Sequence, residues 1–467
     1  MQLQWWSVLP FATMLACIAV LPLVPVTAHW WERRSSQLAI ALALGLPVAV
    51  WMWLVLGWEP VFAAVVEYGQ FISLLLALFI VSGGIFLKGD IEATPRNNTI
   101  FLAIGAVLAS FVGTTGAAML LIRPLLNTNS ERRYRVHTVL FAIFVVANCG
   151  GLLTPLGDPP LFLGFLRGVP FTWTFHLFAE WLFVNAMLLA AYFSLDTYYH
   201  AQEPASSVRL DRTEIEPLGL RGSINFVWFA VIIAAVALAP SIDAEAIELG
   251  EATAMDWVPL REIIMLAAAG ASYALGDRRT RFQDNQFEWG PIAEVATLFI
   301  GIFLTMIPAL HYLDEIADAL PLNQVTFFIF TGGLSSVLDN APTYATFFEL
   351  AGQVTHPGGA VVATVPETYL VSISLGAVLC GAITYIGNGP NFMVKSVADS
   401  RGVEMPSFGG YVVRSFTYLV PVLAVMVCLF IAEPLWVKAV GGLGVVLLLA
   451  NNVRLIRAGR RLALVDD

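Results

Sequence analysis

The sequence predicts an all-α polytopic membrane protein of about 11 transmembrane helices in two inverted-topology repeats, each with a re-entrant hairpin and a broken helix. The first observation is composition: 58% of the 467 residues are hydrophobic and only 12% are charged, against roughly 25% charged in soluble domains. The second is a motif that interrupts an apolar run and recurs 230 residues later. The third is the placement of arginine in the connections.

The spans are predicted to be helices because the apolar runs are continuous and show no barrel-like alternation. A helix satisfies its own backbone hydrogen bonds and needs about 20 apolar residues to cross ~30 Å of hydrocarbon. The first three are expected near 5–27, 36–57 and 69–87. The first lacks a basic start and a cleavage site, so we interpret it as a retained helix.

The connections fall into two classes by charge. Some are rich in Arg and are predicted to be cytoplasmic by the positive-inside rule: 29–36, 127–136, 277–290 and 451–461. Others contain no Lys or Arg and are predicted to lie outside: 58–68, 240–258, 312–321 and 353–367. This places the N-terminus outside and the C-terminus in the cytoplasm, in a protein of the inner (cytoplasmic) membrane.

The first repeat is predicted to span residues 1–198. Segment 98–126 has basic flanks on both sides and a Gly-rich middle, FVGTTG, which predicts a hairpin that returns to the same side. Helix 137–166 is interrupted at TPLGDPP, and 175–198 returns inward. A polar cytoplasmic linker, 199–222, follows.

The second repeat is predicted to span 223–431 in the opposite orientation. After helices near 223–239, 259–276 and 291–311 come a hairpin, 322–352, with its tip at LDNAPT, and a broken helix, 368–399, interrupted at TYIGNGP. Helix 411–431 completes the repeat. The region 432–467 is predicted to be a last helix and a basic cytoplasmic tail.

The two interruptions align without a gap at an offset of 230 residues. They superimpose Thr154 on Thr384, Gly157 on Gly387, Asp158 on Asn388, Pro160 on Pro390 and Phe162 on Phe392. Lipid cannot satisfy the backbone groups that a break exposes, so each break must face protein or water. Paired broken helices in inverted repeats are typical of secondary transporters, which bind substrate near the bilayer midplane.

The predicted site combines two acids with neutral oxygen groups. Asp158 lies in the first break and Asp339 at the second hairpin tip, and charges inside a membrane are by default functional. The neutral groups come from Asn148, Thr154, Asn340, Thr343, Thr384, Asn388 and Asn391. Hard oxygen ligands suit Na⁺ or Li⁺, and desolvation lets a carboxylate hold either a proton or a cation near neutral pH.

Alternatives remain open for individual residues. Asp158 is also placed to cap the following half-helix, and Asp339 to bond to its own turn. Glu294, near the start of the helix before the second hairpin, is either a third ion-coupling acid or a solvated group at the cytoplasmic mouth. Arg123 and Lys395 are expected to compensate the acids' charge.

Several motifs resemble those of the ion transporter superfamily, on the branch that holds the arsenite pump and NhaD-type sodium:proton antiporters. The similar stretches are ANCGGLLTPLGDPP, VLDNAPT and TYIGNGPNF, and the resemblance spans roughly residues 65–430. It implies a scaffold, a mobile transport part and a homodimer with an elevator-like motion. Carried over to this sequence, it points to Asn148, Thr154, Asp158, Asp339, Asn340, Thr384, Asn388 and Asn391.

The departures from the superfamily's patterns separate the functional hypotheses. Dicarboxylate carriers have Ser-Asn-Thr at both tips, whereas this chain has Thr-Thr-Gly at 114–116 and Asp-Asn-Ala at 339–341. An acid at a tip repels a di-anion, which favours Na⁺(Li⁺):H⁺ antiport. The alternative is a Na⁺-coupled citrate or dicarboxylate carrier in which Arg123 and Lys395 hold the anion. Leu161 after GDPP, where arsenite pumps often have Asn, disfavours arsenite.

The sequence does not favour the hypothesis that the protein is an enzyme. It has no nucleotide-binding glycine pattern, no nucleophile elbow and no paired Cys/His metal spacing. We therefore expect no cofactor and no nucleic-acid partner. The predicted partners are the bilayer, the transported Na⁺ and H⁺, and a second copy of the chain.

Overall fold

The computed structural model describes residues 4–22, 24–31, 33–213, 215–248, 250–316, 322–354 and 359–463. Parts of two predicted outer loops, 312–321 and 353–367, and the end of the predicted tail, 432–467, lie outside these residues. Within them the protein is a helical, multi-pass membrane protein, as predicted. The helical stretches long and apolar enough to cross a membrane are Arg34–Leu56, Glu59–Ser82, Trp173–His200, Gly290–Tyr312, Phe408–Ile431 and Leu435–Leu462.

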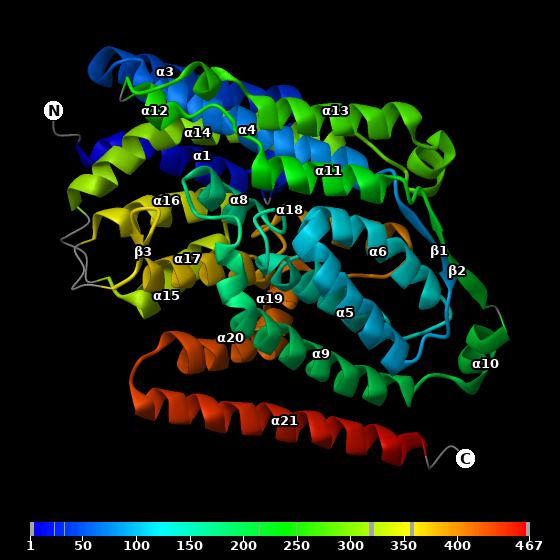
Figure 1. The fold of residues 1–467 in the computed structure, drawn as a ribbon. Helices are drawn as coiled ribbons and strands as arrows, with labels where there is room; N and C mark the ends of the chain where they lie inside the picture. The colour runs from blue at the N-terminus through cyan, green and yellow to red at the C-terminus, as the bar shows by residue number, and fades with distance from the viewer. Residues whose placement is uncertain are drawn as a thin grey trace.

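One group of helices, here the first bundle, packs mainly on itself along one side of the molecule (Figure 1). Its members are α1 (Leu9–Val20), α3 (Arg34–Leu56), α4 (Glu59–Ser82), α11 (Asn225–Leu238), α13 (Leu260–Leu275) and α14 (Gly290–Ile316). Small residues let α3 and α14 approach closely: a Cβ added to Gly301 would lie 2.8 Å from the Cα of Ala41. Such contacts drive association where lipid is as apolar as the side chains.

Most of the remaining helices form the second bundle, which contains both interrupted helices (Figure 1). Two helix pairs belong to it: α5 (Pro95–Val112) with α6 (Thr114–Thr128), and α15 (Gln324–Ser335) with α16 (Asn340–Gln353). Around them lie α9 (Phe178–His200), α19 (Phe408–Tyr418) and α20 (Val420–Met426). Helix α21 (Leu435–Ala463) packs along α9 at the edge.

The interruptions fall at the Gly- and Pro-containing motifs. The first runs through α7 (Val136–Phe141), a π-helical segment (Ala142–Val146), a 3₁₀ turn (Cys149–Leu152) and α8 (Pro159–Leu166). The second runs through α17 (Glu367–Cys380), a 3₁₀ turn (Gly381–Ile383) and α18 (Gly389–Ser400). Pro159 and Pro160 open α8 and Pro390 opens α18, because proline is tolerated in the first turn but not in a helix interior.

Two short antiparallel ribbons interrupt the helical pattern. β1 (Phe86–Asp90) pairs with β2 (Glu216–Arg221), and β3 (Val361–Val362) with β4 (Val365–Pro366). The predicted polar linker, 199–222, contains β2 as well as α10 (Ala205–Thr213). The other short elements are Trp5–Val8, α2 (Pro25–Trp31), Trp173–Leu177, α12 (Ala244–Glu248), Ala254–Trp257, Thr280–Asp284 and Val427–Ile431.

Candidate ion-binding site

Asp158 is the centre of a buried polar cluster in the second bundle. Only 1% of the residue is exposed. The Thr114 hydroxyl donates to its Oδ1 at 2.8 Å, the Asn340 amide donates to Oδ2, and the Asn388 amide lies 3.4 Å from Oδ1. Thr114 and Asn340 are the first residues of α6 and α16, and Asn388 lies in the second break. One carboxylate thus joins both helix-pair tips to both interruptions.

Glycines allow the chain to pack this closely around the carboxylate. Gly113, at the tip between α5 and α6, has φ +83°, a conformation that glycine adopts without steric cost. The next residue, Thr114, donates its N–H to the Gly157 carbonyl at 2.8 Å. A Cβ added to Gly157 would lie 2.1 Å from the Gly151 oxygen. Glycine at these positions is therefore a packing requirement of the site.

Thr154 and Thr384, which align in the sequence, make the same contacts. The Thr154 hydroxyl donates to the Ser110 carbonyl in α5 and accepts from the Leu156 N–H at 3.2 Å. The Thr384 hydroxyl donates to the Ser336 carbonyl at the end of α15 and accepts from the Ile386 N–H at 3.2 Å. Both hydroxyls fix a break to the neighbouring helix pair, which is a positioning role.

Three amides connect the two interruptions directly. The Asn148 amide donates to Asn391 Oδ1 at 2.6 Å, and the Asn388 amide donates to Asn148 Oδ1 at 3.1 Å. Asn391 in turn donates to the Gly381 and Thr384 carbonyls at 2.8 and 2.9 Å. This network satisfies the backbone carbonyls that the second break exposes, as a break inside a membrane requires.

Asp339 has a different environment from Asp158. It is the N-cap of α16, its carboxylate accepts from the Ala341 N–H at 3.4 Å, and it is only half-buried. The Thr343 hydroxyl donates to its carbonyl at 3.1 Å. The neighbouring Asn340 points its amide at Asp158, and its fully buried Oδ1 has no hydrogen-bond partner among the described residues. An unpaired buried acceptor is costly, and a bound cation would satisfy it.

Three other predicted site residues contact groups elsewhere. Glu294 accepts from the Gln37 amide at 3.1 Å, within the first bundle. Arg123 donates to the Asn285 carbonyl and, at 3.4 Å, to Gln286. Lys395 pairs with Asp399 at 2.6 Å on its own helix. The structure thus does not bring these three side chains into contact with Asp158.

Thr114 contacts Asp158 but was not among the site residues predicted from the sequence. The equivalent positions of the two tips could have identified it. Thr114 and Asn340 are each the first residue of the second helix in their helix pair. Their side chains meet the two oxygens of one carboxylate. In the described parts of the chain, the hydrogen-bond partners of Asp158 are all neutral.

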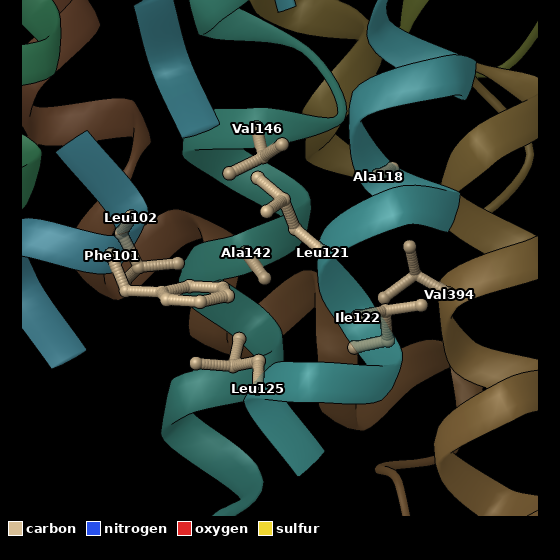
Figure 2. A pocket seen from close by; sticks show the side chains of 9 residues that line it. All are labelled: Phe101, Leu102, Ala118, Leu121, Ile122, Leu125, Ala142, Val146 and Val394. Atoms are coloured by element: carbon tan, nitrogen blue, oxygen red, sulfur yellow. The ribbon is translucent and has the colours of Figure 1, made fainter. Parts of the chain in front are cut away.

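A cavity between α5, α6 and the first interruption is not a binding site. Figure 2 shows its lining side chains, which are all apolar: Phe101, Leu102, Ala118, Leu121, Ile122, Leu125, Ala142, Val146 and Val394. Its volume is about 10 Å³, which is at the lower limit for one water, and it offers no polar partner. It is a packing void.

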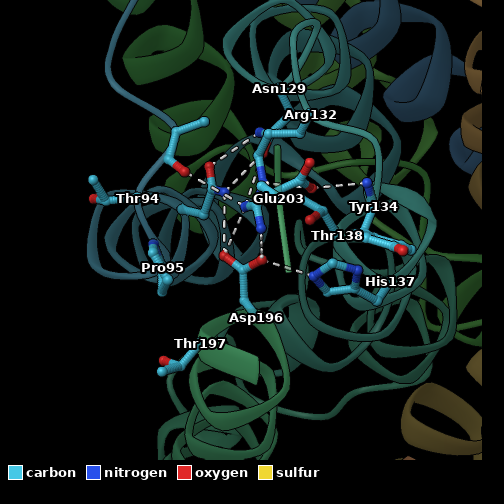
Figure 3. A network of polar contacts seen from close by, with 12 residues as sticks. Thr94, Pro95, Asn129, Arg132, Tyr134, His137, Thr138, Asp196, Thr197 and Glu203 are labelled. Atoms are coloured by element: carbon cyan, nitrogen blue, oxygen red, sulfur yellow. Dashed lines mark hydrogen bonds and ion pairs between the residues drawn. The ribbon is translucent and has the colours of Figure 1, made fainter. Parts of the chain in front are cut away.

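A second buried charged network ties the second bundle together near one end (Figure 3). The Asp196 carboxylate binds Arg132 at 2.7 Å and His137 Nε2 at 2.8 Å. Glu203 accepts from the Arg133 and Tyr134 N–H groups, both at 2.9 Å. These contacts join α9 to the connection between α6 and α7. Because the acids already have cationic or N–H partners, we assign this network a structural role.

Two helices interrupted at repeat-related motifs, with a buried acid where they meet, define a secondary transporter. A family model described as "Putative citrate transport" matches residues 1–431. The chain therefore belongs to this family, which is part of the ion transporter superfamily. A search of curated proteins found no match.

Proposed function

We propose that the protein is a sodium(lithium):proton antiporter that exchanges Na⁺ and H⁺ at Asp158. The observation that carries the proposal is a fully buried carboxylate whose hydrogen-bond partners, among the described residues, are all neutral. A buried carboxylate without a countercharge must bind a proton or a cation to avoid a large desolvation cost. Because one group cannot hold both, each ion displaces the other, which is the requirement for antiport.

The proposed Na⁺ ligands are the Asp158 carboxylate and Asn340 Oδ1, which has no other partner in the described structure. Thr114 and Asn388 orient the carboxylate from the opposite tip and the opposite break. Asp339, half-buried beside Asn340, adds negative charge that attracts a cation. Na⁺ and H⁺ are the transported ions, and no further cofactor is needed.

The test uses everted membrane vesicles that contain the full-length protein and a preformed pH gradient. We expect Na⁺ or Li⁺ to collapse the gradient, and Asp158→Asn to abolish this response. The matched control, Asp243→Asn, makes the same change at an exposed helix cap and should exchange normally. No response to either ion between pH 6 and 9 refutes antiport.

A second candidate is cation-coupled citrate uptake, which the description of the family favours. The residues predicted to hold the anion in this function, Arg123 and Lys395, are bound to other partners here. Citrate would therefore have to recruit them by a rearrangement. Sodium-dependent accumulation of labelled citrate in proteoliposomes, without Na⁺-driven proton movement, would select this function over antiport.

The proposal also includes the orientation and assembly. We place the protein in the inner (cytoplasmic) membrane, with its N-terminus outside and its C-terminus in the cytoplasm, as a homodimer. Labelling of single cysteines at positions 243 and 457 with a membrane-impermeant reagent tests the orientation. In spheroplasts, position 243 should react and position 457 should not.

A further inference from the structure

Arg167, which directly follows α8, binds groups on two other helices. Its Nε and Nη2 donate to Glu67 Oε1 and Oε2 at 2.9 and 3.3 Å. Its Nη1 donates to the Ala345 carbonyl at 3.0 Å and lies 3.4 Å from Glu349 Oε1. The side chain is only 11% exposed. The two-point contact with Glu67 is the strong geometry for an Arg–carboxylate pair.

These contacts cross the boundary between the two bundles. Glu67 belongs to α4 in the first bundle, whereas Ala345 and Glu349 belong to α16 in the second. Helix α8 begins directly after Asp158, and α16 begins at Asn340. The same two helices that hold the candidate ion site are thus joined through Arg167 to the first bundle.

The opposite end of the second bundle has a weaker contact across the same boundary. Arg123 on α6 donates to the Asn285 carbonyl and to Gln286 Oε1, both in the connection that precedes α14. These acceptors are neutral, whereas Arg167 faces two carboxylates. Both guanidinium groups are charged, but only Arg167 adds the attraction of opposite charges to its hydrogen bonds. The predicted topology places the ionic contact outside and the neutral one inside.

We propose that Arg167, Glu67 and Glu349 form a latch that holds the second bundle against the first in this conformation, and that each transport cycle must open it. A secondary transporter exposes its site to alternate sides by moving one part against another. A buried ion pair between the two parts biases that equilibrium through its difference in stability between the states. The inference rests on the class of protein and not on which ion is carried.

The first test measures the latch without measuring transport. The cysteines must leave Glu67 and Glu349 in place, so they are introduced at neighbouring positions of the same boundary. Phe165→Cys on α8 and Arg261→Cys on α13 replace side chains that meet across the same boundary, with the Arg261 guanidinium 5.5 Å from the Phe165 ring centroid. With Arg167 present, a bifunctional thiol reagent should link this pair at least tenfold faster than in Arg167→Gln. Equal rates in the two backgrounds overturn the latch.

The second test asks whether the latch must open. The same double variant, Phe165→Cys with Arg261→Cys, is linked with a reagent that a reductant cleaves, and flux is followed in proteoliposomes. Closing the link should stop flux, and cleaving it should restore flux to at least half. The control pair is Trp6→Cys with Trp51→Cys, whose rings stack at 5.1 Å between the Trp5–Val8 turn and α3, and this pair should tolerate a link. Flux that continues through a closed link between positions 165 and 261 overturns the proposal.

Discussion

Asp158→Asn separates the chemistry of the site from its packing, because the two side chains have the same shape. In the native protein, Thr114 and Asn388 donate to Oδ1 and Asn340 donates to Oδ2. The variant replaces one oxygen by an NH₂ group, which would face the Asn340 amide. Rotating the Asn340 amide by half a turn removes this conflict, since its Oδ1 has no other partner among the described residues. We therefore expect the variant to fold, with a stability change of about 1 kcal/mol.

The effect on ion binding should be much larger than the effect on folding. A cation about 4 Å from a carboxylate gains about 4 kcal/mol at an effective dielectric of about 20. The amide removes this charge, and each 1.4 kcal/mol is tenfold in affinity. The expected loss of Na⁺ affinity is therefore roughly 10³-fold, enough to make exchange undetectable at millimolar Na⁺.

The assay pairs calorimetric titration of the purified full-length protein with Na⁺ and thermal unfolding of the same sample. The antiport hypothesis predicts that the wild-type protein releases protons as it binds Na⁺, so the measured heat should change with the ionisation enthalpy of the buffer. The Asp158→Asn variant should unfold near the wild-type temperature. It should show neither the heat of Na⁺ binding nor the heat of proton release. If the folded variant binds Na⁺ within threefold of wild type, Asp158 is not the cation ligand and the reasoning fails.

Three further changes test the packing and the surface charge. Gly157→Ala places a methyl group 2.1 Å from the Gly151 oxygen and should cost at least ~2 kcal/mol; thermal unfolding checks this against Gly69→Ala, where no atom lies within 4 Å. Thr384→Val removes a buried hydroxyl with two partners and should cost about 1–3 kcal/mol and reduce flux, with Thr346→Val as the peripheral control. Burial and the nearby Glu131 and Asp211 raise the pKa of Asp90, in β1, to about 6, so the folded state binds this proton more tightly than the unfolded chain. Stability should then fall as pH rises from about 4 to 6; Asp90→Asn should remove this dependence and gain ~1 kcal/mol at pH 7 after solvent screening, and an unchanged pH profile of unfolding would contradict it.

The sequence located the interruptions because their cause is local. TPLGDPP and TYIGNGP contain the helix-breaking residues themselves, and a proline stands in the first turn of both α8 and α18. The partners of Glu294, Arg123 and Lys395 depend on which way each helix is turned in the assembled bundle, which composition does not specify. The same limit explains the ribbon of β1 and β2, whose strands lie more than 120 residues apart.

At the second tip, both Asp339 and Asn340 were predicted as site residues, and in the structure Asn340 is the one that contacts Asp158. Asp339 and Asn340 are adjacent, and the sequence favoured the acid as the ligand. The chain turns at Asp339, whose carboxylate caps α16, so the first helical residue, Asn340, faces Asp158. Which of two neighbouring side chains enters a site is decided by the φ and ψ angles of the turn. The observed contact, from the Ala341 N–H to the Asp339 carboxylate, is the one expected if Asp339 bonds to its own turn.

The repeat itself gives the site its charge asymmetry. Asp158 and Asn388 occupy equivalent positions in the two interruptions, and in the structure their side chains meet at 3.4 Å. Two acids at that distance would not both ionise, whereas an acid and an amide make one charged position with a neutral donor beside it. One monovalent cation or one proton neutralises that position, but a citrate tri-anion would add to its charge. An amide in place of a second acid therefore leaves one negative charge for a single positive charge to balance, and this is the support that the pair gives to the proposed antiport.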